Sequence, residues 1–478
     1  MNEQRKTGFL DRALRNLRGA WDKIARGQGD FSSANLSPEL NDEDRARLIE
    51  QMVACLEGVG GEVSARGRAA ALGHAYLALN EAGRKRFLTV LAEEFDVDHD
   101  LVKDAAERVQ NVTADTLRRR AEQDLRAALV APRVRLLTQF NGLPEGVKFL
   151  VDMRAELLAI KPLEGALKDL EQDLKGLMAA WFDIGFLELR QITWQAPAAL
   201  LEKLAAYEAV HRIQGWEDLK HRLAPDRRCY AFFHPSMPEE PLIFVWVALV
   251  KGMSDNIQAL LDEDGAKADP EAADTAVFYS ISNAQVGLRG INFGDFLIKR
   301  VVNSLSRELK NIKAFVTLSP IPGFVKWLET ALEDGEPLLL TDEEAEELTE
   351  ALGKVEGEVE KDQNPLKAAL DKPKWHRQKD LSEAMKATLL RYCAHYLMHA
   401  RRPEGTAMDP VAHFHLSNGA SMGRLNWLAD TSRNGLAQSA GIMINYLYEL
   451  DEIEDNHEAY LGRGEIKASS ATRNHLKT

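Results

Sequence analysis

The hydrophobic pattern of the chain changes near residue 181, and this change limits the folds that the chain can adopt. From residue 37 to about 180, apolar residues recur at helical spacing, and glycine or proline lies near most of the joins. We therefore predict an all-helical bundle for residues 37–180, preceded by an arm formed by residues 1–36. The predicted helices cover about residues 67–80, 82–94, 99–131, 146–159 and 162–180.

Strands and helices alternate after residue 181. The pattern predicts strands at 228–233, 242–250, 275–281 and 313–318, and helices at 197–209, 215–222, 296–309 and 380–399. Residues 181–478 are thus predicted to form one mixed domain, of the α+β or α/β class, and the chain as a whole an α+β protein with two domains. Residues 329–362 are strongly acidic, which is typical of a solvated helical excursion.

Charge and composition exclude several classes of protein. The net charge of −14 argues against general binding to nucleic acid or to an anionic membrane. The longest apolar run, residues 241–250, is too short to cross a membrane, and the basic segment 5–26 is interrupted by acidic residues. The three cysteines, Cys55, Cys229 and Cys393, lack the spacing of a zinc site or a disulfide framework. These features predict a reducing, cytoplasmic location.

A strand, a glycine-rich loop and a helix follow one another between residues 278 and 302. Glycines at 287, 290 and 294 allow backbone conformations that other residues avoid, and the next helix offers free N–H groups in its first turn. Such a loop either turns the chain or holds a phosphate group. The pattern by itself leaves both interpretations open.

Two pairs of polar side chains mark candidate chemistry beyond this loop. Period-two alternation places Thr317 and Ser319 on one face of a strand, where the hydroxyls either satisfy backbone groups or act on a substrate. The same alternation predicts a second strand that aligns His413 with His415. Because no carboxylate or cysteine accompanies them at ligand spacing, acid–base work is favoured over metal binding, and we predict no metal site. His395 and His399, one turn apart, are interpreted as a helix surface.

The loop resembles the coenzyme A loop of the GNAT superfamily. Arg289-Gly-Ile-Asn-Phe-Gly294 is similar to the signature Arg/Gln-x-x-Gly-x-Gly/Ala, with Asn292 in place of one glycine. Asn tolerates left-handed backbone angles better than other non-glycine residues. The resemblance implies a GNAT-like, acyl-CoA-binding domain whose backbone amides hold the diphosphate. The candidate residues are Gly287, Arg289, Gly290, Ile291, Asn292, Phe293, Gly294 and Asp295.

Five further motifs resemble the malonyl-CoA decarboxylase family. They are Phe-Tyr-Ser-Ile-Ser at 278–282, Phe-Leu-Ile-Lys-Arg-Val-Val at 296–302, Leu-Ser-Pro-Ile-Pro-Gly-Phe at 318–324, Phe-His-Leu-x-Asn-Gly-Ala at 414–420 and Arg-x-Asn-Trp-x-Ala-Asp at 424–430. The resemblance implies decarboxylation of malonyl-CoA to acetyl-CoA without metal or organic cofactor. It places the family's catalytic serine and histidine on Ser319 and His415, and its tyrosine on Tyr448.

The chemistry of the residues agrees with that assignment. Loss of carbon dioxide leaves an enolate, which must be stabilised and then protonated. We expect Ser319 to bind the carboxylate or enolate, His415 to stabilise the charge and supply the proton, Thr317 to be a reserve hydroxyl, and His413 to lie behind His415. The alternatives are a GNAT-type acyltransferase and a non-catalytic acyl-CoA-sensing scaffold. The amphipathic helices, together with the oligomers that the resemblance to this family implies, predict a homo-oligomer. It would be a dimer or tetramer formed through the helical domain.

Overall fold

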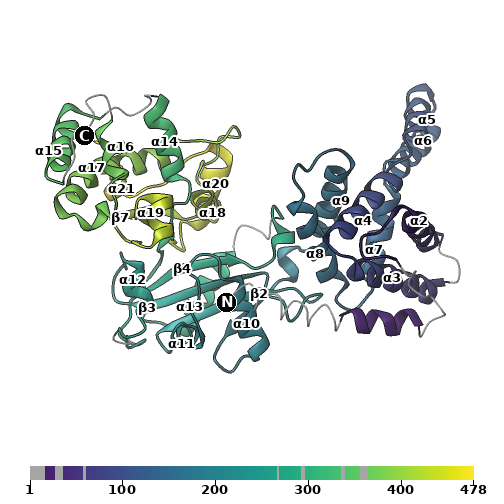
Figure 1. Cartoon of the computed structure of the whole chain (residues 1–478), viewed down its shortest axis with the longest axis horizontal. Coiled ribbons are helices and arrows are strands. Elements are labelled where there is room, and N and C mark those ends of the chain that lie inside the picture. Colours follow the sequence, from purple (N-terminus) through teal and green to yellow (C-terminus); the bar gives the residue numbers. More distant parts are fainter. Residues whose placement is uncertain are drawn as a thin grey trace. The chain divides into compact units, whose positions relative to one another are not determined.

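The chain divides into two compact units that interleave along the sequence. The computed structural model describes residues 17–26, 36–57, 61–265, 268–291, 297–334, 340–355 and 364–477. The helical unit comprises Met1–Glu188, Phe233–Leu242 and Asn283–Phe293, and the mixed unit comprises Leu189–Phe232, Ile243–Ser282 and Gly294–Thr478. A helical N-terminal region and a C-terminal mixed sheet are thus confirmed (Figure 1). The division into two consecutive domains near residue 180 stays a prediction.

The bundle of the helical unit follows its capping signals closely. Its helices are α2 (Asp42–Leu56), α3 (Gly61–Ala78), α4 (Glu81–Glu94), α5 (His99–Asn111), α6 (Asp115–Ala128), α7 (Pro132–Phe140), α8 (Gly146–Ala159) and α9 (Gly165–Trp181). The side chains of Asn41, Asn80 and Asp98 accept hydrogen bonds from backbone N–H groups in the first turns of α2, α4 and α5. The helix predicted at 99–131 is wrong in one respect. It breaks at Val112 and Thr113, where two β-branched residues disfavour helix, and becomes the hairpin α5–α6.

An aromatic core holds the bundle together. Trp21 is fully buried, its ring centroid lies 4.8 Å from that of Phe149, and its indole N–H donates to the carbonyl of Pro144 at 2.9 Å. A Cβ atom on Gly73 would lie 2.0 Å from the Trp21 ring, so α3 must carry glycine there. Residues 17–26 are helical. Part of the predicted N-terminal arm is therefore packed on the bundle.

The described residues of the mixed unit and its borders form one eight-stranded sheet. The strands are β1 (Glu188–Ile192), β2 (Arg227–Phe233), β3 (Ile243–Val250), β4 (Thr275–Asn283), β5 (Ala314–Thr317), β6 (Ser319–Pro320), β7 (Ser421–Asn426) and β8 (Met443–Leu447). Their order is β1-β2-β3-β4-β5-β8-β6, with β7 also paired to β8. β4 and β5 are parallel, whereas β5, β6 and β7 all run antiparallel to β8. β3 is buried along almost its whole length, as its unbroken apolar run predicts.

Helices alternate with these strands along the rest of the described chain. They are α10 (Ala198–Tyr207), α11 (Trp216–His221), α12 (Ile257–Leu261), α13 (Leu297–Glu308), α14 (Phe324–Asp334), α15 (Asp342–Gly353), α16 (Pro365–Leu370), α17 (Lys379–His399), α18 (Pro410–Ser417), α19 (Arg433–Ser439), α20 (Ile453–Arg463) and α21 (Ser470–Asn474), with 3-10 turns η1 (Ile184–Phe186), η2 (Val286–Leu288) and η3 (Trp375–Arg377). Within the described residues, no helix is both long enough and apolar enough to cross a membrane.

Two sequence expectations need correction. The predicted strand with His413 and His415 is the helix α18, because Asp409 caps it and Pro410 occupies its first position. The acidic segment, where described, is helical as predicted but not wholly solvated. Within α15, Leu348 and Leu352 are buried and Glu344 pairs with Arg391 of α17.

Candidate active site

The two hydroxyls predicted to share a strand face do meet, where β5 ends. Parallel pairing of β4 with β5 stops at Phe278 and Thr317, and the chain then passes to β6. Ser319 Oγ donates to Thr317 Oγ1 at 2.8 Å. Thr317 Oγ1 also accepts the backbone N–H of Tyr446 in β8 at 3.0 Å. The sheet therefore orients Thr317, and Thr317 in turn orients the Ser319 hydroxyl.

His415 reaches the same point from α18. Its Nε2 lies 3.0 Å from Ser319 Oγ, and its Nδ1 lies 2.8 Å from the hydroxyl of Tyr448. His415, Ser319 and Tyr448 are 2%, 5% and 2% exposed. The structure thus brings together Thr317, Ser319, His415 and Tyr448, although the sequence placed His415 on the wrong type of element.

His413 does not join this cluster. Residues two apart in a helix point about 200° away from each other, whereas a strand would have aligned them. The Nδ1 atom of His413 lies 2.9 Å from the hydroxyl of Tyr460, which also accepts the N–H of Ala407 at 2.9 Å. The prediction that His413 lies behind His415 is therefore wrong.

The carboxylate of Asp409 connects the turn that follows Ser319 with helix α18, which carries His415. Asp409 accepts the N–H groups of Val411 and Ala412 at 2.9 Å, which caps α18, and its other oxygen accepts the N–H of Gly323 at 3.2 Å. A Cβ atom on Gly323 would lie 2.2 Å from the hydroxyl of Tyr396, so the turn needs glycine. Asp409 was not predicted as a site residue, although Asp-Pro before a helical segment is a recognisable helix start.

The cluster carries no charge at neutral pH. Complete burial lowers the pKa of His415 to about 3 and holds the pKa of Tyr448 well above its usual value, so the imidazole is neutral and the phenol protonated. Because the Ser319 hydroxyl donates to Thr317, the Nε2–H of His415 is left to donate to Ser319. Nδ1 then accepts from Tyr448. A directed chain of hydrogen bonds runs from Tyr448 through His415 to Ser319 and Thr317.

Two residues of β8 support this chain and were not predicted. The ring of Tyr446 stacks on the imidazole of His415 at a centroid distance of 4.5 Å. Asn445 donates to the carbonyl of Thr317 at 2.6 Å and accepts from Asn426 at 2.8 Å. Asn426 is thus structural, and so is Asp430, which accepts the N–H of Ser432, the N-cap residue of α19.

The described part of the predicted coenzyme A loop contains Gly287, Arg289, Gly290 and Ile291. The remaining candidates, Asn292, Phe293, Gly294 and Asp295, lie outside the described residues. A Cβ atom on Gly287 would lie 1.8 Å from the carbonyl oxygen of Val151, so the close approach that requires glycine at 287 is to α8. Gly290 has a φ of +75°, which favours glycine, and both Arg289 and Gly290 are exposed. These two residues remain the described candidates for a ligand contact.

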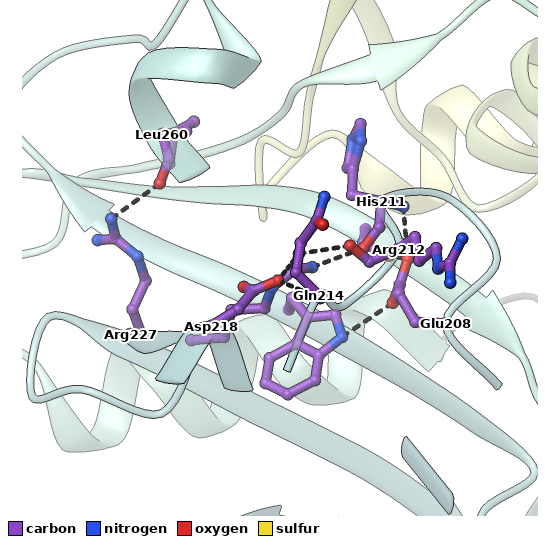
Figure 2. Close-up of polar contacts among 10 residues, drawn as sticks. Glu208, His211, Arg212, Gln214, Asp218, Arg227 and Leu260 are labelled. Carbon is purple, nitrogen blue, oxygen red and sulfur yellow. Dashed lines mark hydrogen bonds and ion pairs between the residues drawn. The ribbon is translucent and has the colours of Figure 1, made fainter. Parts of the chain in front are cut away.

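A second polar cluster in the mixed unit has a different character. A cavity of about 420 Å³ is lined by Arg212, Gln214, Asp218, Arg222, Leu261 and Glu263. Arg222 donates to both oxygens of Asp218 at 2.7 and 3.2 Å, and Asp218 also accepts the backbone N–H of Gln214 (Figure 2). Glu208 likewise accepts from the backbone of His211 (Figure 2). Glu208, Asp218 and Arg222 thus hold the 208–222 segment in place, which indicates a structural cluster.

No group of three or more potential metal ligands occurs among the described residues. The pair His395 and His399 lies on α17 with ring centroids 4.9 Å apart, and the ring of Trp327 stacks on His395. His399 is exposed and His395 is half-buried. This geometry agrees with the helix surface that the sequence predicted.

Known proteins resemble the chain along most of its length. Residues 95–182 match the malonyl-CoA decarboxylase N-terminal domain, and residues 185–478 match the malonyl-CoA decarboxylase C-terminal domain. The mitochondrial malonyl-CoA decarboxylase of Rattus norvegicus is 42% identical over 404 residues, which cover 81% of this chain and 80% of the rat protein.

Solved structures agree with these matches. The crystal structure of malonyl-CoA decarboxylase from Rhodopseudomonas palustris shares 42% identity, with a TM-score of 0.81 over 90% of this chain and 99% of that one. The corresponding protein from Agrobacterium vitis shares 38% identity, with a TM-score of 0.79 over 90% and 99% of the two chains. Sequence and structure thus point to the same set of relatives.

Proposed function

The chain belongs to the malonyl-CoA decarboxylase family, and we propose how it converts malonyl-CoA into acetyl-CoA and carbon dioxide. In this proposal Ser319 binds the malonyl carboxylate or the developing enolate, and His415 stabilises that charge and delivers the proton. The observation that supports it best is the buried contact of 3.0 Å between Ser319 Oγ and His415 Nε2, which joins segments 96 residues apart.

The first step breaks the bond between the carboxylate carbon and the carbon beside the thioester carbonyl. Its electron pair moves into the thioester as an enolate, and carbon dioxide leaves. The uncharged lining formed by Thr317, Ser319, His415 and Tyr448 favours this step, because it solvates a carboxylate less well than water does. The Ser319 hydroxyl and the His415 N–H, which donate to Thr317 and Ser319 in the absence of substrate, turn to donate hydrogen bonds to the developing oxyanion.

The second step adds one proton to the enolate carbon. The neutral imidazole of His415 gives up its Nε2 proton, either directly or through the Ser319 hydroxyl, and the Tyr448 hydroxyl restores a proton at Nδ1. A solvent proton then reaches Nε2 while the Nδ1 proton returns to the Tyr448 oxygen, which restores the resting tautomer, so the reaction consumes one proton overall. Because burial lowers the pKa of His415 to about 3, the imidazole is not protonated before the reaction. The proton donor in the proposal is therefore a relay of neutral groups.

The same proposal covers the finer expectations from the sequence. The mixed unit is GNAT-like, which the parallel strands β4 and β5, connected through α13, support. The loop of residues 289–295 binds the coenzyme A diphosphate. No metal or organic cofactor takes part, since the substrate's own thioester delocalises the charge. Homo-oligomer formation through the helical region stays a prediction, and so does a cytoplasmic location, because the rat relative is described as mitochondrial.

The proposal is tested by supplying malonyl-CoA alone to the purified protein and measuring acetyl-CoA by chromatography. We expect stoichiometric acetyl-CoA from the native protein and almost none from His415→Ala. Acetyl transfer that requires an added amine would instead identify an acyltransferase. Tight binding of malonyl-CoA without turnover would identify a sensing scaffold.

A further inference from the structure

The turn that begins the candidate coenzyme A loop is built into the helical unit. Arg154 of α8 donates to the carbonyl of Gly287 and, at 2.9 Å, to the carbonyl of Arg289. The same guanidinium pairs with Glu171 of α9, and the two side chains are 2% and 14% exposed. Together with the contact between Gly287 and Val151, these bonds hold residues 287–289 on α8 and α9.

Two exposed cations flank the glycine that follows this turn. A Cβ atom on Gly290 would lie 3.6 Å from Nζ of Lys175, which projects from α9, and Arg289 is the neighbouring residue in the chain. Within the part of the chain that the structure describes, neither the ammonium group of Lys175 nor the guanidinium group of Arg289 has a hydrogen-bond or ion-pair partner. The ammonium group of Lys175 therefore lies beside the backbone of Gly290, which has no side chain to shield it, and the exposed Arg289 directly precedes this glycine.

Three acidic residues of α8 and α9 are engaged by other cations. On α9, Glu171 is engaged by Arg154 and Asp173 by Arg133, with the Arg133 contact at 2.6 Å. Asp152 of α8 is paired with Lys148. Since these three acids are bound to other cations, they leave the charges of Lys175 and Arg289 available to an anionic ligand.

We propose that Lys175 and Arg289 bind phosphate groups of the coenzyme A part of malonyl-CoA. Arginine suits a phosphate by its planar pair of donors, and lysine suits it as a compact charge on a flexible stem. The helical unit thereby takes part in substrate binding, beyond the docking role that its sequence suggests. This inference rests on the proposed function, because it assigns a subsite to that substrate.

Steady-state kinetics of Lys175→Met and Arg289→Gln test the inference, with malonyl-CoA and malonyl-pantetheine as substrates. Malonyl-pantetheine carries the same reacting group without the phosphates of coenzyme A. We expect each variant to raise KM for malonyl-CoA about tenfold to a hundredfold, as for loss of a hydrogen bond to a charged group, with kcat within about twofold. The kinetics with malonyl-pantetheine should not change. Lys103→Met, which removes an exposed lysine from α5, is the matched control and should behave as the native protein does.

Calorimetric titration with coenzyme A and with dephospho-coenzyme A identifies the phosphate. An equal loss of affinity for both ligands in Lys175→Met would place the lysine on the diphosphate, and a loss for coenzyme A alone would place it on the 3′-phosphate. If both variants keep KM for malonyl-CoA within twofold of native, or weaken malonyl-pantetheine to the same degree, the inference is wrong. Failure of the native protein to release acetyl-CoA would instead overturn the proposed function, so the two failures are distinguishable.

Discussion

The two regions assigned to substrate differ in almost every physical property. The cluster around Ser319 and His415 is buried and uncharged, and its groups are held by hydrogen bonds to one another. The region around Lys175 and Arg289 is exposed and positively charged. A reaction that removes a carboxylate benefits from the first environment, and recognition of phosphates benefits from the second. The difference implies that substitutions in the buried cluster change kcat, whereas substitutions in the charged region change KM.

The largest expected effect is that of His415→Ala. Removing a positioned acid–base group lowers the rate about a hundredfold to ten-thousandfold, so kcat should fall by that factor while coenzyme A affinity stays within about twofold. Steady-state kinetics and calorimetry measure the two quantities. His413→Ala is the matched control, because His413 lies on the opposite side of α18 and contacts Tyr460. Equal activity losses in the two variants would contradict the assignment of His415.

Arg154→Met should cost the free energy of unfolding about 3–5 kcal/mol, because it leaves Glu171 and two loop carbonyls buried without their cation. Chemical denaturation measures this loss. The double variant Arg154→Met/Glu171→Leu removes both charges and should recover part of it. Arg154 acts on substrate only by positioning residues 287–289, so any activity change in the folded variant should raise KM for malonyl-CoA more than it lowers kcat.

Tyr448→Phe should lower kcat about tenfold to a hundredfold, since it removes the hydroxyl that donates to Nδ1 of His415. The comparison is Tyr446→Phe, which keeps the stacked ring and removes a hydroxyl that has no partner among the described residues. We expect that variant to lose less than about threefold, because no hydrogen bond is broken. Similar losses in both variants would show that ring packing, rather than the hydrogen-bonded chain, supports the histidine.

The last prediction concerns stability instead of turnover, as a pH dependence of unfolding. In the folded protein the pKa of His415 is about 3, below its unfolded value near 6.5, so the unfolded chain binds the proton more readily. The contribution of His415 to the free energy of unfolding is fully present above pH 6.5. It is lost as the pH falls from 6.5 towards 3, by at most about 1.4 kcal/mol per pH unit. Denaturation between pH 4 and 8 measures this slope. The protonation of His415 can be followed directly by the imidazole signal in NMR spectra. This signal should not titrate between pH 5 and 8. A titration midpoint near 6.5 would contradict the relay of neutral groups.

The sequence predicted the site unevenly, and the reason is visible at single positions. Alternation over residues 314–319 placed Thr317 and Ser319 on one face, and the two hydroxyls are indeed in contact. The same argument failed for His413 and His415, because a polar–apolar alternation over so few residues fits a short helix as well, and the capping signal of Asp409 and Pro410 outweighs it. Tyr446 and Asn445 could not be identified, since a residue of β8 gains a role only through the strands paired with it.

By itself, the sequence determined the helical and mixed regions and the strand–loop–helix segment. It also determined the serine and the histidine, Ser319 and His415, as the candidate catalytic residues. These depend on local periodicity, capping and turn chemistry, which a short window of sequence contains. Only the tertiary structure decided that Tyr448, His415, Ser319 and Thr317 form one buried chain of hydrogen bonds, and that α9 brings Lys175 beside Gly290. Such contacts join residues distant in sequence, and the burial that lowers the pKa of His415 exists only when the chain is folded around it.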